Sequence, residues 1–547
     1  MFPTEDPMLC RMRGRLSLGA IVLLVGLLLD PAVAADPESP AKQERVSRRA
    51  YLSRVSTEDR LAVRRQGVVG GGGVSRSPIR SALAPVEELE FDGIPGNENH
   101  VSPSDTVGAA GTTRVVTAVN VRYAVYDKTG LALQGPASIK ALFPSLPGAA
   151  FVFDPKVVYD HYRERFVLVA VAGRFGFNPQ GWILVAGIPD ATAEDTSTWC
   201  RRKLAADQVP RFGNLWGDYP GVGFDAERVF ITTNQFTFGD EFRYAQILSL
   251  RKAGLYDCDR PLQKEVFARN QTRDPQGTPG FTIQPAVTET ETGREPPGFL
   301  LSFQDTELCR PGSLPCGRRL TVWRISETPD GLRLSKRSVG TGLQMIAPFG
   351  TQKGGDVNCA EITTCWDTGD LRLINAFYDA DLGLLYGAHA VNNPEEPDAY
   401  VESVIRWYEV DVTPWGSTSI SRKGLIAQDG RDAGWPVMAT DGAGNVMLTY
   451  SLAGAPGTGE FLSTYAASVG IGSTMPEVQL LRAGESTYIE ARAPDVQRWG
   501  DYNGINRDPV DPLDVWIVNQ IAADDTEGPA TVTDLWLQVV NRVSEGP

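Results

Sequence analysis

Histidine is nearly absent from this chain, which has three histidines in 547 residues. His100, His161 and His389 lie far apart in the sequence, and none belongs to an HExxH motif. The chain also has no P-loop, no GxGxxG in a usable context and no intact GxSxG elbow. These absences argue against zincin metalloproteases, nucleotide-binding enzymes and α/β-hydrolases.

Long apolar runs are missing as well, with one exception near the start. Three arginines in residues 11–15 precede the apolar run LSLGAIVLLVGLLL, and Ala32-Val-Ala34 follows it. This order of basic, apolar and small residues is typical of a secretory signal. The run is too short for a confident membrane span. We therefore expect a signal peptide over residues 1–35, a periplasmic or extracellular protein, and no transmembrane span in the mature chain.

Cysteine is scarce, and no two cysteines have CxxC spacing, so structural zinc is not expected. Cys10 lies in or before the signal, which leaves six cysteines for the exported chain. An even set in an exported protein indicates disulfides, although six cysteines allow fifteen pairings. Proximity along the chain favours three pairs: Cys309–Cys316, Cys359–Cys365 and, by remainder, Cys200–Cys258.

Positive charge is concentrated in one segment and is in deficit elsewhere. Residues 36–85 contain 10 basic and 5 acidic side chains and include a run of four glycines at 70–73, which predicts a flexible leader. Residues 86–547 contain 39 basic and 59 acidic side chains, a net charge of −20. An acidic body of this kind disfavours nucleic acid and permits cations and neutral ligands. We expect a monomer whose partner is a carbohydrate or an envelope protein.

A sustained helical period is not found after residue 85, but a repeated tetrapeptide is. Trp216-Gly-Asp-Tyr219 returns as Trp499-Gly-Asp-Tyr502, and Asn-Gln follows each copy after about twenty residues. Recurrence of a motif inside a longer matching frame indicates duplicated structural units. The frame consists of a polar or aromatic residue, an alternating apolar stretch, a Gly/Asp turn and a second apolar strand.

Seven copies of this frame are found, and the residue that opens each copy is called its anchor. The anchors are Asp105, Asp154, Asp218, Gln284, Asp370, Trp435 and Asp501, at intervals of 49, 64, 66, 86, 65 and 66 residues. Units of this length hold four short strands, and such sheets repeated around an axis form a β-propeller. We predict an all-β protein, a seven-bladed β-propeller of four-stranded antiparallel blades over residues 86–547. Two β-sandwich domains are the alternative, but they do not predict a shared interval.

Two segments are candidates to close the ring. VEELEF at 86–91 precedes the first unit, and TVTDLWLQVVNRV at 531–543 follows the last inner hairpin. Pairing of the two within one blade would remove open sheet edges. The alternative is that 86–91 is an ordinary lead-in strand.

The acidic anchors are the main candidates for a functional site. If each opens an inner strand, five carboxylates approach one mouth of the central channel: Asp105, Asp154, Asp218, Asp370 and Asp501. Because they repel one another, they need a cation, arginine partners or raised pKa values. Three interpretations stay open: calcium held by Asp154, Asp218, Asp370 and Asp501, an acid/base pair that cleaves glycosides, or turn formation by each aspartate.

Aromatic residues and one histidine complete the candidate set. Trp216, Trp499, Tyr219 and Tyr502 can stack on a sugar, or they can fill the space between blades. His389 ends a strand pattern, so it either faces the channel or is hydrogen-bonded within the fold.

Several segments resemble a group of exported bacterial β-propeller proteins loosely grouped with sialidase-like or BNR-type propellers. They are SPSDTVGAAGTTRVVTAVNVRYAVYDKTG, the unit DPKVVYD…RERFVLVAV and both WGDY units. The resemblance covers roughly residues 90–545 and implies the propeller fold, which hosts many unrelated activities. No intact SxDxGxxW box of the sialidases is present, so no catalytic residue is carried over.

Two classes of function therefore remain. The first is an exported, non-catalytic binding or scaffold module at the cell envelope or outside the cell. The second is a carbohydrate-active enzyme, a sialidase-like glycoside hydrolase or polysaccharide lyase, that uses the carboxylates at the channel mouth. The absence of a nucleophile or cofactor signature favours the first. Calcium is the one cofactor expected.

Overall fold

The computed structural model describes the part of the chain that follows the predicted leader. The described residues are 83–96, 102–210, 214–290, 296–304, 308, 317–342, 345, 365–393, 403–454, 460–489, 497–524, 532–533 and 535–545. The predicted signal and nearly all of the predicted leader lie outside them. Among the described residues, no helix has the length and apolar composition needed to cross a membrane.

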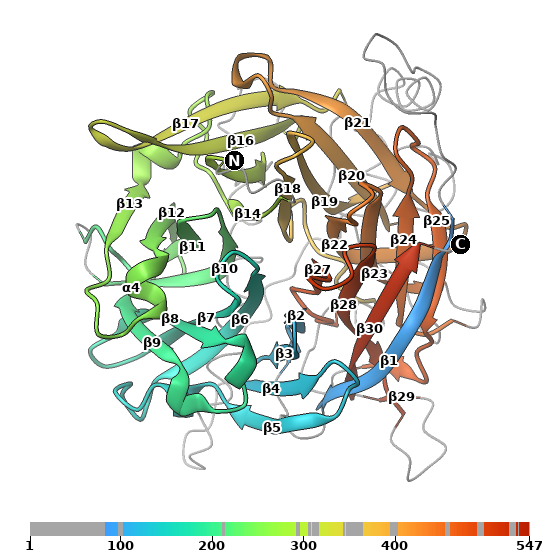
Figure 1. Ribbon diagram of the computed structural model, residues 1–547, viewed down its shortest axis with the longest axis horizontal. Coiled ribbons are helices and arrows are strands. Elements are labelled where there is room, and N and C mark those ends of the chain that lie inside the picture. The colour runs from blue at the N-terminus through green and yellow to red at the C-terminus, as the bar shows by residue number, and fades with distance from the viewer. Residues whose placement is uncertain are drawn as a thin grey trace, which may run out of the picture.

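The described strands form antiparallel sets of four arranged in a ring, which is consistent with the seven blades that the repeat predicts (Figure 1). Blades one to three are β2 (Val107–Ala110), β3 (Arg114–Val119), β4 (Arg122–Asp127) and β5 (Ala132–Ser138); β6 (Phe151–Asp160), β7 (Arg165–Arg174), β8 (Gln180–Pro189) and β9 (Cys200–Ala205); and β10 (Leu215–Phe224), β11 (Arg228–Thr237), β12 (Phe242–Arg251) and β13 (Lys264–Ala268). Blades four to six are β14 (Gln284–Glu289), β15 (Gly298–Phe303), β16 (Arg319–Thr328) and β17 (Gly331–Gly340); β18 (Ala376–Asp379), β19 (Leu384–Asn392), β20 (Ser403–Asp411) and β21 (Ser419–Ile426); and β22 (Arg431–Thr440), β23 (Val446–Gly454), β24 (Ser463–Val469) and β25 (Glu477–Arg482). Blade seven is β27 (Gly504–Arg507), β28 (Asp514–Ala522), β30 (Trp536–Glu545) and β1 (Pro85–Pro95).

Short elements lie between the blades. They are helix α4 (Lys252–Tyr256), the parallel pair β26 (Thr487–Tyr488) and β29 (Val532–Thr533), and the 3-10 turns η2 (Lys140–Leu142), η3 (Asp190–Thr192), η4 (Thr196–Thr198), η5 (Arg269–Thr272) and η7 (Trp415–Ser417). The inner strand β14 pairs in parallel with β10 on one side and with β18 on the other. Their starts therefore lie at one end of the central axis and their ends at the other.

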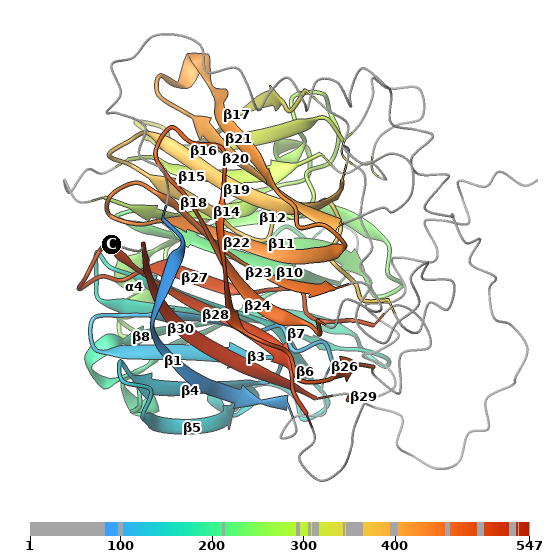
Figure 2. The ribbon, with the colours of Figure 1, turned by 90° about the vertical axis from the view of Figure 1, so that its right-hand side faces the viewer.

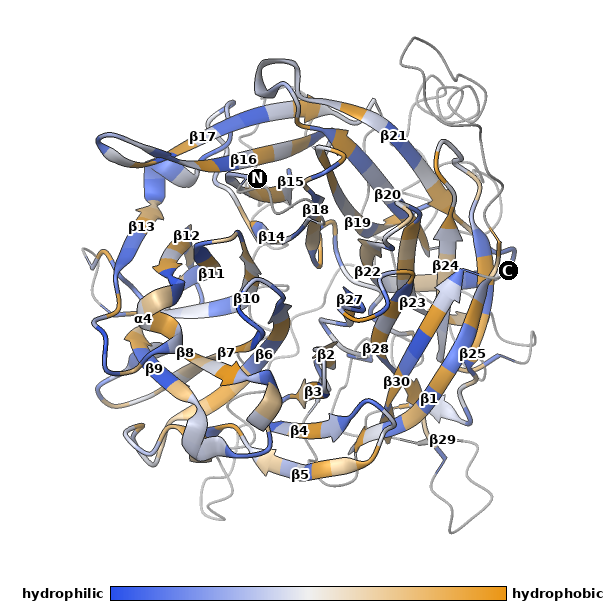
Figure 3. Cartoon of the chain, in the orientation of Figure 1, coloured by the Kyte–Doolittle hydropathy of each residue, from blue (hydrophilic) through white to orange (hydrophobic). Residues whose placement is uncertain are grey.

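Burial follows the order of strands within a blade. The inner strands and their neighbours are almost wholly buried, whereas the outer strands β5 and β25 alternate between exposed and partly buried residues. Figure 3 shows this as hydrophilic residues along the outer strands and apolar residues within the blades. The middle of a blade is covered by neighbouring blades on both faces, so its strands are apolar at nearly every position.

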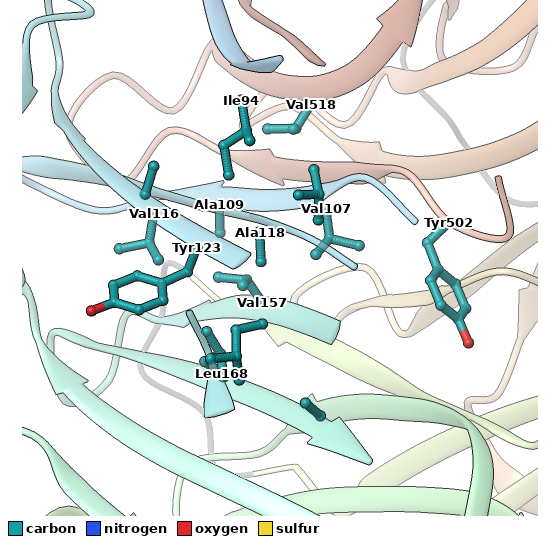
Figure 4. Packing of buried hydrophobic residues seen from close by; sticks show 14 of the residues in the cluster. Ile94, Val107, Ala109, Val116, Ala118, Tyr123, Val157, Leu168, Tyr502 and Val518 are labelled. Atoms are coloured by element: carbon teal, nitrogen blue, oxygen red, sulfur yellow. The ribbon is translucent and has the colours of Figure 1, made fainter. Parts of the chain in front are cut away.

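Neighbouring blades are held together by apolar side chains that interdigitate between them. Ala118 of β3 and Val107 of β2 belong to one cluster with Val157 of β6 and Leu168 of β7, and Figure 4 shows these side chains between the blades. Tyr502 lies at the edge of the same cluster. Because one blade cannot bury both of its faces, this contact is what makes the units depend on one another.

The ring is closed by its first strand, as predicted. β1 pairs antiparallel with β30, and Val86 lies opposite Ser544 and Phe91 opposite Val540. In Figure 2 the two strands run side by side across the edge of the molecule. Residues at opposite ends of the described chain thus complete blade seven.

One predicted disulfide is present between two blades. Cys200 at the start of β9 is bonded to Cys258, which follows α4, and their Cα atoms are 5.3 Å apart. Cys365 is also disulfide-bonded. Cys309, Cys316 and Cys359 lie outside the described residues, so the two loop pairings stay predictions.

Candidate functional site at the axis of the ring

The anchors lie at the starts of the inner strands. Asp154 and Asp218 lie within the first residues of β6 and β10, and Asp105 and Asp501 shortly precede β2 and β27. Asp370 precedes β18 by six residues. The predicted carboxylates are therefore brought to one end of the axis.

A β-bulge determines which side chains reach the axis. In β6, β10 and β22, two residues lie opposite one residue of the next strand, and the first of the two has a positive φ: Asp154 (52°), Tyr219 (50°) and Trp435 (53°). The second is proline each time, a residue that suits a bulge because it has no N–H to donate. Bulges of this type redirect a side chain out of the sheet.

The bulge also corrects the alignment of the repeated frames. The residue of β10 that matches Asp154 is Tyr219, because the two have the same backbone conformation and the same place in the bulge. Asp218 pairs opposite Asn234, one residue before the bulge. Matching by residue type therefore placed the third anchor one position too early.

The duplicated tyrosines meet at the axis. The rings of Tyr219 in blade three and Tyr502 in blade seven are 4.6 Å apart between centroids, and both residues are buried. The Tyr219 hydroxyl donates to the carbonyl of Asp501 at 2.8 Å, and the Tyr502 hydroxyl donates to Asp154 at 3.0 Å. Blades three and seven are not neighbours, so this contact spans the centre of the ring. We call the two rings the tyrosine plug.

Around the plug, two carboxylates are held by hydrogen bonds from other blades. Asp154 accepts the backbone N–H of Tyr219 at 3.0 Å in addition to the Tyr502 hydroxyl. Asp105 accepts the Asn120 amide at 2.6 Å and the backbone N–H of Asp501 at 3.0 Å. These carboxylates therefore connect the inner strands to one another.

Burial and crowding raise the pKa values of three of these groups. Burial is the largest cause for each, and a neighbouring carboxylate is the next: Asp501 for Asp105 and Asp154, and Asp154 for Asp218. Arg372 opposes the increase at Asp218. The carboxylate of Asp501 thus lies close enough to those of Asp105 and Asp154 to raise their pKa values.

Basic side chains supply part of the opposing charge. Arg498 contacts Asp501 at 2.7 Å, and Arg372 contacts Asp370 at 2.5 Å and lies 4.2 Å from the centroid of the Tyr219 ring. Burial opposes the charge of both arginines, but the nearby carboxylates outweigh it and raise their pKa values.

Lys156 is the third basic group and differs from the arginines. Its Nζ lies 3.5 Å from the centroid of the Tyr502 ring, and it is within 4 Å of no carboxylate among the described residues. Burial lowers the pKa of Lys156 to about 7, although Asp154, Asp105 and Asp501 oppose this shift.

The described residues do not include a cluster of three or more side chains that matches the predicted calcium site. Among the described residues, no group of three His, Cys, Asp or Glu side chains is placed to hold a metal ion. Asp154 and Asp501 are engaged by the hydrogen bonds and the ion pair given above. Calcium binding stays a prediction.

The remaining candidates lie within the fold. Trp216 and Trp499 are 4 % and 1 % exposed, and their indole N–H groups donate to the Thr237 carbonyl and the Ser451 hydroxyl, both at 2.9 Å. His389 lies in β19, the second strand of its blade, and its ring nitrogens bond the Leu371 carbonyl at 2.8 Å and the Tyr408 hydroxyl at 3.1 Å. Burial lowers the pKa of His389 to about 4. These contacts fit packing and structural hydrogen bonding.

Sequence reasoning missed Lys156, Arg372, Arg498 and Asp367. Asp367 is partly buried, and its pKa is raised first by desolvation and then by the carboxylate of Asp501. Each basic residue lies within three positions of an anchor, in the sequences DPK, DLR and RWGD. A search for basic residues next to the acidic anchors would have found all three.

Comparisons with known proteins assign no family to this chain. No family model matches the chain, and no curated protein matches it. Similar solved structures include the GH93 α-L-arabinofuranosidase of Fusarium graminearum (9 % identity, 85 % of this chain and 98 % of that chain, TM-score 0.37). Others are the WD40 domain of SCAP from fission yeast (10 %, 84 % and 98 %, 0.33) and an α-L-arabinanase of Penicillium chrysogenum (8 %, 84 % and 99 %, 0.34). Similarity at this level carries no information about substrate or reaction, and the narrower resemblance to sialidase-like propellers stays a prediction.

Proposed function

We propose that this protein is an exported, non-catalytic β-propeller that binds its ligand on the surface of the ring and not within the axis. The tyrosine plug is the observation that carries the proposal. It occupies the centre of the ring where an enzyme of this architecture would need open space above its carboxylates.

A very small cavity lies beside the plug. The cavity lined by Phe281, Phe303, Leu371 and Arg372 has a volume of about 10 Å³, room for about one water molecule. Sites for small organic ligands usually measure about 300–1,000 Å³. The carboxylates of Asp105 and Asp154 are committed to hydrogen bonds that join the blades, so they act as structural acceptors.

Export is supported by the disulfide between Cys200 and Cys258. Disulfides persist in oxidising compartments and are rare in the cytosol. Together with the predicted signal, this bond favours the periplasm or the exterior of the cell. Carbohydrate or an envelope protein is the ligand class that we propose there.

The second candidate is a glycoside hydrolase or lyase. Its supporting observation is the raised pKa of Asp105, Asp154 and Asp218, since burial and like charges also tune a general acid. Asp218 is partly exposed, so it is the carboxylate best placed to reach a substrate.

One experiment separates the two candidates. The exported chain is applied to a glycan array and, in parallel, assayed for turnover of fluorogenic glycosides that include arabinofuranosides. We expect saturable binding without turnover, and unchanged binding in Asp218→Asn. Turnover that Asp218→Asn abolishes would establish the enzyme and reject the binding module.

A further inference from the structure

A larger cavity lies at the opposite end of the axis from the tyrosine plug. It has a volume of about 140 Å³ and is lined by residues that end inner strands or follow them, among them Tyr159, His161, Glu289, Arg507, Asp508 and Pro512. Glu289 is the last residue of β14 and Arg507 the last of β27, whereas the anchors are at the strand starts. We call it the far-end cavity.

Two charged groups in the lining are already neutralised. Asp508 forms an ion pair with Lys128 at 2.7 Å and accepts the Trp516 indole N–H at 2.7 Å. Arg507 contacts Asp379 at 3.2 Å and donates to the Thr440 hydroxyl at 2.7 Å. These two groups serve the fold, so neither accounts for what the cavity holds.

His161 and Glu289 have binding capacity that the fold does not use. Both ring nitrogens of His161 are buried and form no hydrogen bond with a described residue. Nδ1 lies 3.3 Å from the Glu289 carboxylate, but the two are not aligned for a hydrogen bond. A buried polar group without a partner is costly, so a pair of this kind indicates a ligand or water.

The electrostatic surroundings favour a cation. Burial and the carboxylates of Glu289, Asp225, Asp160 and Asp381 raise the pKa of the hydroxyl of Tyr162, whose ring lies 4.1 Å from that of His161. Lys252, whose Nζ lies 4.8 Å from the centroid of the Tyr162 ring, is bound to Asp160 at 2.7 Å. Negative charge therefore exceeds positive charge on the side of the cavity formed by His161 and Glu289.

We propose that the far-end cavity binds a small primary amine in its ammonium form. The ammonium group donates to the Glu289 carboxylate beside His161, and the carbon chain lies against Tyr159 and Pro512. A cavity of about 150 Å³ holds a benzene molecule, so the ligand has about six heavy atoms at most. This site is separate from the surface proposed above for the macromolecular ligand.

Three ligands of similar shape and different charge test whether binding requires a positive charge. They are applied to the parent chain without any substitution. Isothermal titration at pH 8, where an ordinary histidine is neutral, compares butylammonium, butan-1-ol and butyrate. We expect one saturable site for butylammonium, at least tenfold weaker binding of butan-1-ol, and no binding of butyrate. Equal binding of butan-1-ol would show an apolar cavity, and no binding of butylammonium would show a water site; either result overturns the proposal.

A pair of matched variants tests whether Glu289 binds the ammonium group. Glu289→Gln removes the charge and keeps the shape, and we expect at least tenfold weaker binding of butylammonium. Glu241→Gln is the control, because Glu241 is exposed and follows β11 at the other end of the ring. Unchanged binding in Glu289→Gln would reject the assignment. If Glu289→Gln does not fold, the comparison of the three ligands on the parent chain still tests the proposal.

Discussion

Tyr219 and Tyr502 come from two copies of one sequence motif, and each completes the surroundings of the other. The two rings pack against each other at an interplanar angle of 56°, and each hydroxyl donates to a group near the other copy of the motif. Duplication has thus placed the same side chain on two sides of the axis, where the pair fills space that neither residue fills alone.

Loss of one of these hydroxyls tests the plug. Tyr502→Phe removes the bond to Asp154 and leaves a buried acceptor with fewer donors, so we expect a loss of about 1–3 kcal/mol in the free energy of unfolding. Urea denaturation measures it. Tyr162→Phe is the matched control, because the Tyr162 hydroxyl is buried without a hydrogen-bond partner among the described residues. Equal losses in both variants would contradict a special role for Tyr502.

Lys156 makes stability depend on pH in the alkaline range. Its pKa falls from an unfolded value of about 10.5 to about 7 in the fold. Between these values the unfolded chain binds more protons than the folded chain, so stability rises with pH. We expect the difference in unfolding free energy between the parent chain and Lys156→Met to shift in favour of the parent from about pH 7 to about pH 10.

The measurement is urea denaturation at several pH values. Lys203→Met, which removes an exposed lysine of β9, corrects for the loss of one positive charge. A constant difference between the parent chain and Lys156→Met across this range would mean that Lys156 keeps its proton in the fold.

The acidic anchors could be placed near the strand starts from the sequence, to within one residue in β10, but their contacts could not be predicted. A turn residue before an alternating apolar stretch marks the start of a strand, and this locates Asp154 and Asp501. The contact between Tyr219 and Tyr502 joins residues 283 positions apart. It depends on the curvature of the closed ring, which no local pattern contains.

At the level of the strands, the bulges explain why matching the repeated frames by residue type misaligned β10 by one residue. The bulge selects a position by backbone conformation, and aspartate, tyrosine and tryptophan all occur there. Proline after the bulge is the more regular marker, since it follows Asp154, Tyr219 and Trp435 alike. Residue type at the anchor varies because its side chain faces the axis, where each blade has a different neighbour.

The Cys200–Cys258 bond stabilises the contact between blades two and three. Its sequence separation is 58 residues, and closure of a loop of this size is usually worth about 2–4 kcal/mol. We expect the double variant Cys200→Ser/Cys258→Ser to lose about that much in urea denaturation. The double variant avoids a free thiol that would confuse the result. An unchanged midpoint would show that packing alone holds the two blades.

For the ring as a unit, the charge balance at the axis predicts the response to chelation. Arg498 and Arg372 supply positive charge where calcium was predicted to do so. We therefore expect EDTA to leave the melting temperature unchanged, and Asp218→Asn/Asp501→Asn to show the same lack of response. A melting temperature that falls with EDTA and recovers with added calcium would establish the predicted calcium site.

Closure by β1 and β30 has a consequence for biosynthesis. The strand that is made first waits for the strand that is made last, since Val86 pairs with Ser544. During that interval six blades can assemble, while only the outer strand of the seventh, β1, has been made. A nascent chain held at a translocation pore would therefore present one unpaired strand until synthesis is nearly complete. If the chain is exported as proposed, β1 has to be kept from premature pairing during this time, and the predicted basic leader directly precedes it.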